Sequence, residues 1–396
     1  MKNIIWTTGH IRKLDDIVEA KNCYIQDSKG NRYIDLESGV WATSLGHCNA
    51  RVNSIIQSQI NKIIHSGFNY SHPIIEKAAQ NILETANFKG GKCEFLCSGS
   101  EAVEYAVRIA KTTTDKPLML SFSDSFFGAY GEASKKDSKS NYIYKRLECS
   151  CNIHNGGCIG ECKEFNDIPF DQIGIFLFEP GSSSGLVRFP SQKLIDKIAK
   201  NIYSNSGIIV ANEITTGIGR TGKWFGFQHY NIQADIVAMG KGLGNGYPVS
   251  AVIISKDIAE KLGNKSFLYS QSHQNDPLGA SVANEVINII KEDDLLQRCN
   301  KLSNKLVNQL IEIKSKNSVI KEIRCRGFML GIELFKDADY IIDEMFKRGF
   351  LLLKRPNAEV IRMDPALTIE EETLDLFVEN FKQIVQDVDN KKNNYR

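Results

Sequence analysis

Short, unbroken apolar runs alternate with amphipathic segments through the middle of the chain, and this alternation limits the fold more than any other feature. The apolar runs occupy residues 92–97, 117–122, 173–178, 207–212 and 234–240. Their continuity is typical of strands in a parallel sheet that is covered on both faces. The amphipathic segments, at 51–64, 73–86 and 101–111, carry apolar residues three and four positions apart, as helices do. The pattern predicts an α/β fold with a large, doubly wound, mostly parallel sheet.

Both ends of the chain have a different pattern. Residues 23–39 alternate apolar and polar side chains around a Ser-Lys-Gly-Asn turn, which predicts an antiparallel hairpin. Further on, helical periodicity at 280–291, 302–314 and 371–386 surrounds apolar runs at 326–335 and 350–356. We therefore expect residues 50–285 to form the large domain, and residues 1–49 and 286–396 to form together a smaller α+β domain.

The composition excludes several classes of protein. Hydrophobic residues make up 42% and charged residues 24%, as in folded soluble chains. With 49 basic and 47 acidic residues the net charge is +2, too small to indicate binding to nucleic acid or to an anionic membrane. No stretch approaches the roughly 18 apolar residues of a membrane span, and no signal-peptide core is present. We expect a cytoplasmic protein whose ten cysteines are reduced thiols.

Polar residues follow the predicted strands where the strands end. Glu179 follows one run, Asn212 and Glu213 end the next, and Lys241 follows the last. Parallel sheets bind ligands beyond the carboxyl ends of their strands, so these side chains are candidates for one site. The same edge holds a Ser98-Gly99-Ser100 turn between a strand and a helix. The turn predicts a phosphate site at the helix start, although an ordinary helix cap would have the same sequence.

Lys241 lies between Gly240 and Gly242, where the backbone leaves room for a ligand and the amine can lose part of its water shell. Desolvation lowers the pKa of a lysine and makes the neutral, nucleophilic amine available for a Schiff base. A solvated loop lysine is the ordinary alternative. A phosphate turn at the same edge favours a site for pyridoxal phosphate.

At this point the chain resembles the class III aminotransferases, which depend on pyridoxal phosphate and have fold type I. The resemblance extends over nearly the whole length and includes these blocks in order: YIDLESGVWATSLGH, FLCSGSEAVEYAVRIAK, SFFGAY, FLFEPGSSSG, NEITTGIGRTGKWFGFQHY, ADIVAMGKGLGNGYPVSAV, NDPLG, RGFMLGIEL and VIRMDPALT. It implies transfer of an amino group from an amino acid or ω-amine to a 2-oxo acid. It also implies a homodimer with active sites at the interface.

The resemblance assigns roles residue by residue. Lys241 would hold the cofactor as an aldimine and then carry the proton, while Gly99 and Ser100, with Ser98 beside them, would bind the phosphate. Ser272 would reach the phosphate from the partner subunit. Phe126 would lie against the pyridine face, with core packing as the alternative. Trp41 would line the substrate pocket unless it is a structural indole, and Arg362 would bind a substrate carboxylate unless it forms a surface ion pair.

Three residues depart from the family's pattern. Asn212 stands where relatives usually have an aspartate that keeps the pyridine nitrogen protonated, and an amide supplies no such countercharge. Thr215 replaces a common glutamine beside the cofactor's phenolic oxygen. Ser184 replaces the gating glutamate of ornithine-type members, which removes the main support for an ornithine-like substrate. Glu179 and Glu213 remain as polar support for the cofactor.

Four cysteines, Cys149, Cys151, Cys158 and Cys162, crowd into one polar segment with His154. Four thiols can bind zinc, yet this spacing matches none of the well-marked zinc patterns. Reduced thiols or a redox-labile loop remain the main interpretation, and no metal is assigned to the active site.

Two alternatives to a transaminase stay open. An amino acid racemase or epimerase, or an aminomutase, would use the same fold and the same lysine. A non-catalytic dimer that only binds the cofactor is the other alternative, because Asn212 weakens the ring as an electron sink.

Overall fold

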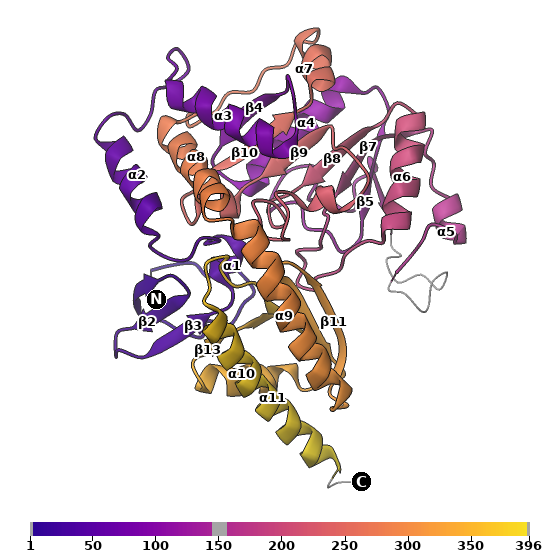
Figure 1. Ribbon diagram of the computed structural model, residues 1–396. Coiled ribbons are helices and arrows are strands. Elements are labelled where there is room, and N and C mark those ends of the chain that lie inside the picture. The colour runs from indigo at the N-terminus through magenta and orange to yellow at the C-terminus, as the bar shows by residue number, and fades with distance from the viewer. Residues whose placement is uncertain (1–2, 145–156, 394–396) are drawn as a thin grey trace.

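The computed structural model describes residues 3–144 and 157–393 (Figure 1). Its largest element is a seven-stranded sheet with the order β4-β10-β9-β8-β7-β5-β6. The strands are β4 (Lys92–Leu96), β5 (Leu118–Phe122), β6 (Asn141–Tyr144), β7 (Ile173–Phe178), β8 (Ile208–Asn212), β9 (Ile236–Met239) and β10 (Ser250–Ile254). Strands β6, β5, β7, β8 and β9 are parallel, whereas β10 is antiparallel to both β9 and β4.

The five apolar runs of the sequence are strands of this sheet, and β7, β8 and β9 are buried along their whole length. Alternate side chains on a strand face opposite sides. Ile175 and Leu177 pack with helix α4 (Gly99–Thr113) and with Ile258 of α7 (Lys256–Gly263). Phe176 and Phe178 belong to the core on the other face, which includes α6 (Gln192–Ser204). Because both faces are covered, these strands carry almost no polar side chain until they end.

Other helices surround the sheet or lead into it. They are α1 (Ser38–Trp41), α2 (Ala50–Ile60), α3 (Pro73–Ala86), α5 (Lys163–Asn166) and α8 (Pro277–Glu292), together with the 3₁₀ turns η2 (Gly226–His229) and η3 (Lys241–Gly244). Helix α8 packs against α2 and α3. The strand β10 was missed by the sequence analysis, because Pro248 and the glycines before it resemble a loop that continues.

Two four-stranded sheets lie below the large sheet in Figure 1. One has the order β1-β2-β3-β13 and the other β11-β12-β15-β14. Their strands are β1 (Ile17–Lys21), β2 (Tyr24–Asp27), β3 (Arg32–Asp35), β11 (Ile320–Arg326), β12 (Met329–Leu334), β13 (Phe350–Leu351), β14 (Leu353–Lys354) and β15 (Val360–Met363). The helices of this part are α9 (Leu295–Ser315), α10 (Ala338–Lys347) and α11 (Glu371–Asn393).

The two ends of the chain meet in the first small sheet. β2 and β3 form the antiparallel hairpin that alternation predicts, and β13 pairs with β3 in parallel. The yellow and indigo ribbons therefore lie side by side in Figure 1. The domain boundaries stay a prediction, and α8 runs without a break across residue 285.

Candidate active site

The carboxyl ends of the parallel strands gather the polar residues that the sequence singles out. Ser98 follows β4, Glu179 follows β7, Asn212 ends β8, and Lys241 follows β9 after one glycine. β4, β7, β8 and β9 run in one direction, so these residues share one edge of the sheet.

The turn before α4 is arranged to bind an anion. Ser98 is the N-cap, and its hydroxyl accepts the amide of Glu101 at 3.2 Å. The amides of Gly99 and Ser100 have no carbonyl partner within the helix, since the first amides of any helix lack one. A Cβ on Gly99 would lie 2.8 Å from Ile214 Cγ2, so glycine keeps this approach open. The helix start thus offers two amides and a positive dipole end to a phosphate.

Lys241 occupies a strained position directly after β9. Its φ is 46°, in the left-handed region, and it begins the turn η3. Gly240 lies next to the phosphate turn, because a Cβ there would be 3.6 Å from Gly99 Cα. Burial and the nearby charge of Arg362 lower the pKa of Lys241 to about 8, against the opposing effects of Glu179 and Asp364. A substantial fraction of the amine is therefore neutral near pH 8.

Trp41 is the aromatic surface that two cations of the site share. Lys241 Nζ lies 4.8 Å from the centroid of the Trp41 ring, and Arg362 Cζ lies 3.6 Å from it. The indole is buried at 3% exposure, so its face is shielded from water. Desolvated cation–π contacts contribute about 2 kcal/mol.

A left-handed turn places Trp41. Ser38, Gly39, Val40 and Trp41 all have φ between 47° and 65°. Left-handed backbone costs about 1–2 kcal/mol for each non-glycine residue. The carboxylate of Asp35 offsets part of this cost by accepting the amides of Glu37 at 2.8 Å and Ser38 at 3.0 Å. Strain of this kind is typical of functional sites.

Arg362 is buried and paired. It lies on β15 and is 7% exposed, and its Nε is 2.6 Å from Oδ2 of Asp364, which is fully buried. Burial raises the pKa of Asp364 to about 6, while Arg362 and Arg220 oppose that rise. Among the described residues, no side chain or backbone group hydrogen-bonds to Arg362 Nη2. A buried donor without a partner is uncommon in a folded protein, and this nitrogen suits the carboxylate of a bound ligand.

Asn212 is held by Phe126 and Glu179. Its Nδ2 donates to the carbonyl of Phe126 at 3.0 Å and to Glu179 Oε1 at 3.4 Å. Its Oδ1 accepts the amide of Ile214 at 3.3 Å. Glu179 in turn accepts the Phe126 amide at 2.9 Å and the Ser183 hydroxyl at 2.5 Å, and burial raises the pKa of Glu179 to about 8. The carbonyl fixes the orientation of the amide, with the NH₂ group toward Phe126 and Glu179.

Other sequence-predicted residues lie near this edge with fewer contacts. The Phe126 ring is 54% exposed, whereas Thr215 is buried and its Oγ1 has no hydrogen-bond partner in the described part of the chain. The hydroxyl of Ser184 is likewise buried, with no hydrogen bond to any described residue. Ser272 is exposed in the segment before α8. Glu213 is fully buried and accepts the amides of Gly226 and Phe227, both at 2.7 Å.

Two acidic residues of the site were missed by the sequence analysis. Asp364 stands two positions after Arg362, and alternation along a strand puts both on one face, so the motif itself contained the signal. Glu37 follows the hairpin, and burial together with Asp35 raises the pKa of Glu37 to about 7, whereas Arg362 and Lys13 lower it. No spacing in the sequence indicates that Glu37 lies within the field of Arg362.

Histidine and cysteine side chains form two further groups, and no hydrogen bond or ion pair joins either group to Lys241 among the described residues. Within the described ranges, one group has the geometry to hold a metal ion, formed by His65, His273 and Asp276. Each imidazole is already hydrogen-bonded to one oxygen of Asp276, at 2.5 and 2.6 Å. Of the cysteine cluster, Cys158 and Cys162 are described, whereas Cys149, Cys151 and His154 lie outside the described residues.

The arrangement fits pyridoxal phosphate. The free amides at the start of α4 suit a phosphate, and the Lys241 amine suits an aldehyde. The buried Thr215 hydroxyl has no partner among the described residues, which suits a polar group of a ligand.

Comparisons with known proteins agree with this geometry. The family model described as aminotransferase class-III matches residues 8–385. Acetylornithine aminotransferase of Bacillus subtilis is 30% identical over 386 residues, which cover 93% of this chain and 94% of that protein. Leucine/methionine racemase of Thermococcus litoralis is 29% identical over 407 residues, covering 94% and 90%.

Solved structures share the fold. An S-selective transaminase from Arthrobacter sp. superposes with a TM-score of 0.89 at 20% identity, covering 98% of this chain and 97% of that one. Acetylornithine aminotransferase from Elizabethkingia anophelis gives a TM-score of 0.81 at 21% identity, covering 96% and 95%. The predicted fold class is confirmed.

Proposed function

Because the chain belongs to the class III aminotransferases and depends on pyridoxal phosphate, we propose that it is a transaminase. It would move an amino group from an amino acid or ω-amine donor to a 2-oxo acid by means of Lys241. The observation that carries the proposal is the Lys241 amine, whose pKa is lowered to about 8, beside Trp41 and Arg362 and near the amides of α4. A transaminase needs an amine that can be neutral, an anion site and a carboxylate site, and these lie together here.

Bound pyridoxal phosphate supplies an aldehyde that bonds amines and a ring that stabilises negative charge on the adjacent carbon. The amides of Gly99 and Ser100 are proposed to bind the phosphate. Lys241 Nζ, once neutral, is proposed to take the proton from the amine-bearing carbon of the donor and to return a proton on the cofactor side. Its low pKa suits both tasks near neutral pH.

Arg362 is proposed to orient the substrate. Its Nη2 would donate to a substrate carboxylate, while Asp364 holds the guanidinium through Nε. Trp41 lies under the guanidinium and limits its movement, and the indole excludes water from the space next to Lys241. A fixed carboxylate sets the reacting carbon within reach of the amine.

Asn212 is proposed to face the cofactor in place of the usual acid. Its Nδ2 is committed to Phe126 and Glu179, and its Oδ1 accepts the Ile214 amide with one lone pair, which leaves the second lone pair of Oδ1 for a ligand. A neutral oxygen accepts a hydrogen bond but provides no countercharge, so we expect a slower proton transfer than an aspartate would give.

The donor is proposed to differ from ornithine. Although the relatives include acetylornithine and ornithine aminotransferases, Ser184 offers a buried hydroxyl where the ornithine-type glutamate is expected. Glu37 lies within the electrostatic field of Arg362, which lowers the pKa of Glu37 against the effect of burial. A donor whose carboxylate is bound by Arg362 and whose side chain needs no acidic partner at position 184 suits this pocket.

The racemase relative of Thermococcus litoralis supports one alternative, in which Lys241 returns the proton to the opposite face of the same carbon. Products decide between the two. A transaminase releases an oxo acid and consumes an oxo acid acceptor, whereas a racemase inverts an enantiopure amino acid without an acceptor. Inversion at full rate without any 2-oxo acid would overturn the transaminase proposal.

Borohydride reduction tests the role of Lys241. Reduction of the cofactor-loaded protein should attach the cofactor to the peptide that contains Lys241, as read by mass spectrometry. Lys241→Ala should abolish the label, while Lys256→Ala, at an exposed lysine of α7, should keep it. The label on another lysine would contradict the assignment. A non-catalytic dimer would carry the label yet show no change in absorbance with any donor amine.

The protein is proposed to act as a homodimer in the cytoplasm. Ser272 is exposed in the single chain, as expected for a hydroxyl that serves the partner's phosphate site. In the part of the chain that is described, no helix is both long and apolar enough to cross a membrane. Mixed dimers of Lys241→Ala and Ser272→Ala chains test the assembly, because one of their two sites would have both residues. The mixed dimers should therefore retain more cofactor than either variant homodimer does. Equal retention in the mixed dimers and in the two variant homodimers would exclude a shared site.

A further inference from the structure

Asp276 lies at the start of α8, but its carboxylate does not cap the helix. Its two oxygens contact two imidazoles instead, since Oδ1 is 2.5 Å from His65 Nδ1 and Oδ2 is 2.6 Å from His273 Nδ1. An ionised carboxylate only accepts hydrogen bonds, so both Nδ1 atoms donate in this arrangement. One carboxylate thus gathers two histidines from distant parts of the sequence, although an aspartate at this position ordinarily caps its helix.

The three side chains form a ligand set for a metal ion. His65 Nδ1, His273 Nδ1 and a carboxylate oxygen of Asp276 all lie within 4.8 Å of one another. Two imidazoles and one carboxylate are a known ligand set for zinc, which binds a water as its fourth ligand in such sites. Ligand atoms on a tetrahedral zinc ion are about 3.4 Å apart, because each lies at about 2.1 Å from the ion. The ion would therefore lengthen each contact to Asp276 by about 1 Å.

The surroundings leave space for this movement and for the water. The side chains of His65 and His273 are 41% and 60% exposed, whereas that of Asp276 is 15% exposed. A cavity of about 220 Å³ is lined in part by His273, Asp276, Cys97 and Tyr247. When Nδ1 of a neutral imidazole binds a metal, the ring proton is carried by Nε2. Both histidines can therefore change from hydrogen-bond donors to metal ligands without a change of charge.

The segment that carries His273 and Asp276 is held in place by β4. The amide of Asn275 donates to the carbonyl of Phe95 at 3.0 Å, and the amide of Phe95 donates to Asn275 Oδ1 at 2.9 Å. The side chain of Asn275 also donates to Glu94 at 2.9 Å. Asn275 has a φ of 56°, in the left-handed region that asparagine tolerates better than most residues. These contacts fix the backbone near two of the three ligands before any ion binds.

We propose that His65, His273 and Asp276 bind one divalent transition-metal ion, zinc, through the two Nδ1 atoms and the carboxylate. The ion would join residues 61–72, between α2 and α3, to residues 264–276, which precede α8. His273 directly follows Ser272, whose hydroxyl is proposed to serve the partner's phosphate site. The ion would thus fix the segment that carries this hydroxyl. All three ligands come from one chain.

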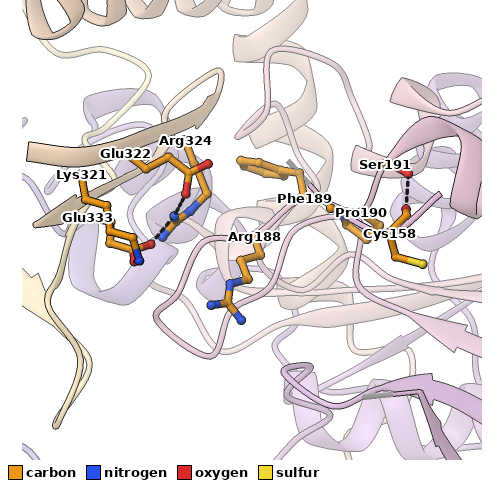
Figure 2. Close-up of a pocket in the computed structure, with 10 residues that line it drawn as sticks. Cys158, Arg188, Phe189, Pro190, Ser191, Lys321, Glu322, Arg324 and Glu333 are labelled. Carbon is orange, nitrogen blue, oxygen red and sulfur yellow. Dashed lines mark hydrogen bonds and ion pairs between the residues drawn. The ribbon is translucent and has the colours of Figure 1, made fainter. Parts of the chain in front are cut away.

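The pocket in Figure 2 offers no comparable ligand set among its described residues. Arg324 pairs there with Glu322 and Glu333. Lys321 pairs with Glu333 at 2.6 Å. These ion pairs neutralise the charges within the protein, whereas two neutral imidazoles and one carboxylate suit a divalent cation.

Zinc binding by the cofactor-loaded protein tests the proposal. After removal of metals with a chelating resin, the wild type should bind one zinc ion per chain more than the His65→Gln/His273→Gln double variant at micromolar free zinc. Equilibrium dialysis with metal analysis measures the difference. Asp276→Asn should lose the same ion, because the amide carries no charge and still suits the start of a helix. His10→Gln, at an exposed histidine outside the group, is the matched control and should bind zinc as the wild type does.

Two outcomes of this titration would overturn the site. One is equal zinc content in the wild type and in the double variant. The other is a difference that develops only at millimolar zinc, because such weak binding is that of ordinary surface histidines.

Oxidation by bound copper keeps the proposal testable if a variant does not fold. Copper(II) binds the same imidazole ligands, and with ascorbate and oxygen it oxidises the side chains next to it. In the wild-type protein with an equimolar amount of copper, His65 and His273 should gain an oxygen atom far more often than His10, as read by peptide mass spectrometry. Added zinc should suppress this oxidation. Equal oxidation of the three histidines would refute the site. None of these readouts depends on transaminase activity, so failure here leaves the proposed function untouched.

Discussion

The guanidinium carbon of Arg362 lies 3.6 Å from the centroid of the Trp41 ring, and the amine of Lys241 lies 4.8 Å from the same ring. Two cations that share one aromatic surface repel each other, and this repulsion is one cause of the lowered pKa of Lys241. The same contact therefore positions a substrate-binding group and adjusts the acidity of the amine.

The rate at which the apoprotein captures pyridoxal phosphate should follow the neutral fraction of Lys241. Because the pKa is lowered to about 8, the rate should rise with pH up to about 8 and then level off, whereas an unperturbed lysine would keep rising toward about pH 10.5. Arg362→Met should move this midpoint to higher pH. Arg326→Met, at a guanidinium that contacts Phe189 and Tyr230, is the control and should not move it. Stopped-flow absorbance measures both, and an unmoved midpoint in Arg362→Met would remove repulsion as a cause.

Arg362→Lys should weaken binding of the 2-oxo acid more than it slows turnover. The variant keeps the charge but loses the planar fork, and a charge-assisted hydrogen bond is worth about 1.5–3 kcal/mol, so the KM should rise roughly ten- to a hundred-fold. Reaction with a donor amine that has no carboxylate should be unchanged in a single half-reaction. If Arg362→Lys slows the half-reaction with that amine as much as it slows the half-reaction with an amino acid donor, Arg362 acts on something other than the carboxylate.

Removal of the Arg362 charge should also destabilise the apoprotein, because Asp364 would remain buried without its partner. The expected loss in the free energy of unfolding for Arg362→Met is about 3–5 kcal/mol at neutral pH. Arg362→Met with Asp364→Asn should recover much of it, as measured by urea unfolding. Burial raises the pKa of Asp364 to about 6 even though Arg362 opposes that rise, so without Arg362 the pKa should be higher still, and the single variant should recover part of its stability as the pH falls and the carboxyl is protonated.

Asn212→Asp should speed the half-reaction with a donor amine by on the order of ten-fold, or about 1.4 kcal/mol of barrier. A carboxylate would supply the countercharge that the amide lacks. In the apoprotein it would face the Phe126 carbonyl and Glu179, so we expect a loss of about 1–3 kcal/mol of stability before the cofactor binds. Asn212→Ala is the matched control, with a similar loss of stability and no gain in rate. Unchanged half-reaction kinetics in Asn212→Asp would refute this account of the ring nitrogen.

The sequence predicted the sheet well because strands that are covered on both faces must be continuously apolar. Residues 173–178 became β7 with every side chain buried. Lys241 and Asn212 could be placed at one edge for the same reason. β10 escaped prediction, since its five residues follow a turn rich in glycine and its antiparallel pairing depends on two distant strands.

Contacts between distant parts of the chain were beyond the reach of spacing arguments. Trp41 was expected to line the pocket, but its contact with Arg362 depends on how a left-handed turn near the N-terminus meets β15. Glu37 belongs to no sequence motif, and only its electrostatic interaction with Arg362 in the structure connects it to the site. The orientation of the Asn212 amide likewise required the Phe126 carbonyl.

The parallel pairing of β3 with β13 has a consequence for biosynthesis. During translation the segment that bears Trp41 leaves the ribosome long before β13 and β15 are made, so the indole meets Arg362 only after nearly all of the polypeptide has been synthesised. The sheet that contains β3 can therefore be completed only after residue 351 has left the ribosome, which makes this part of the protein dependent on the late portion of the chain.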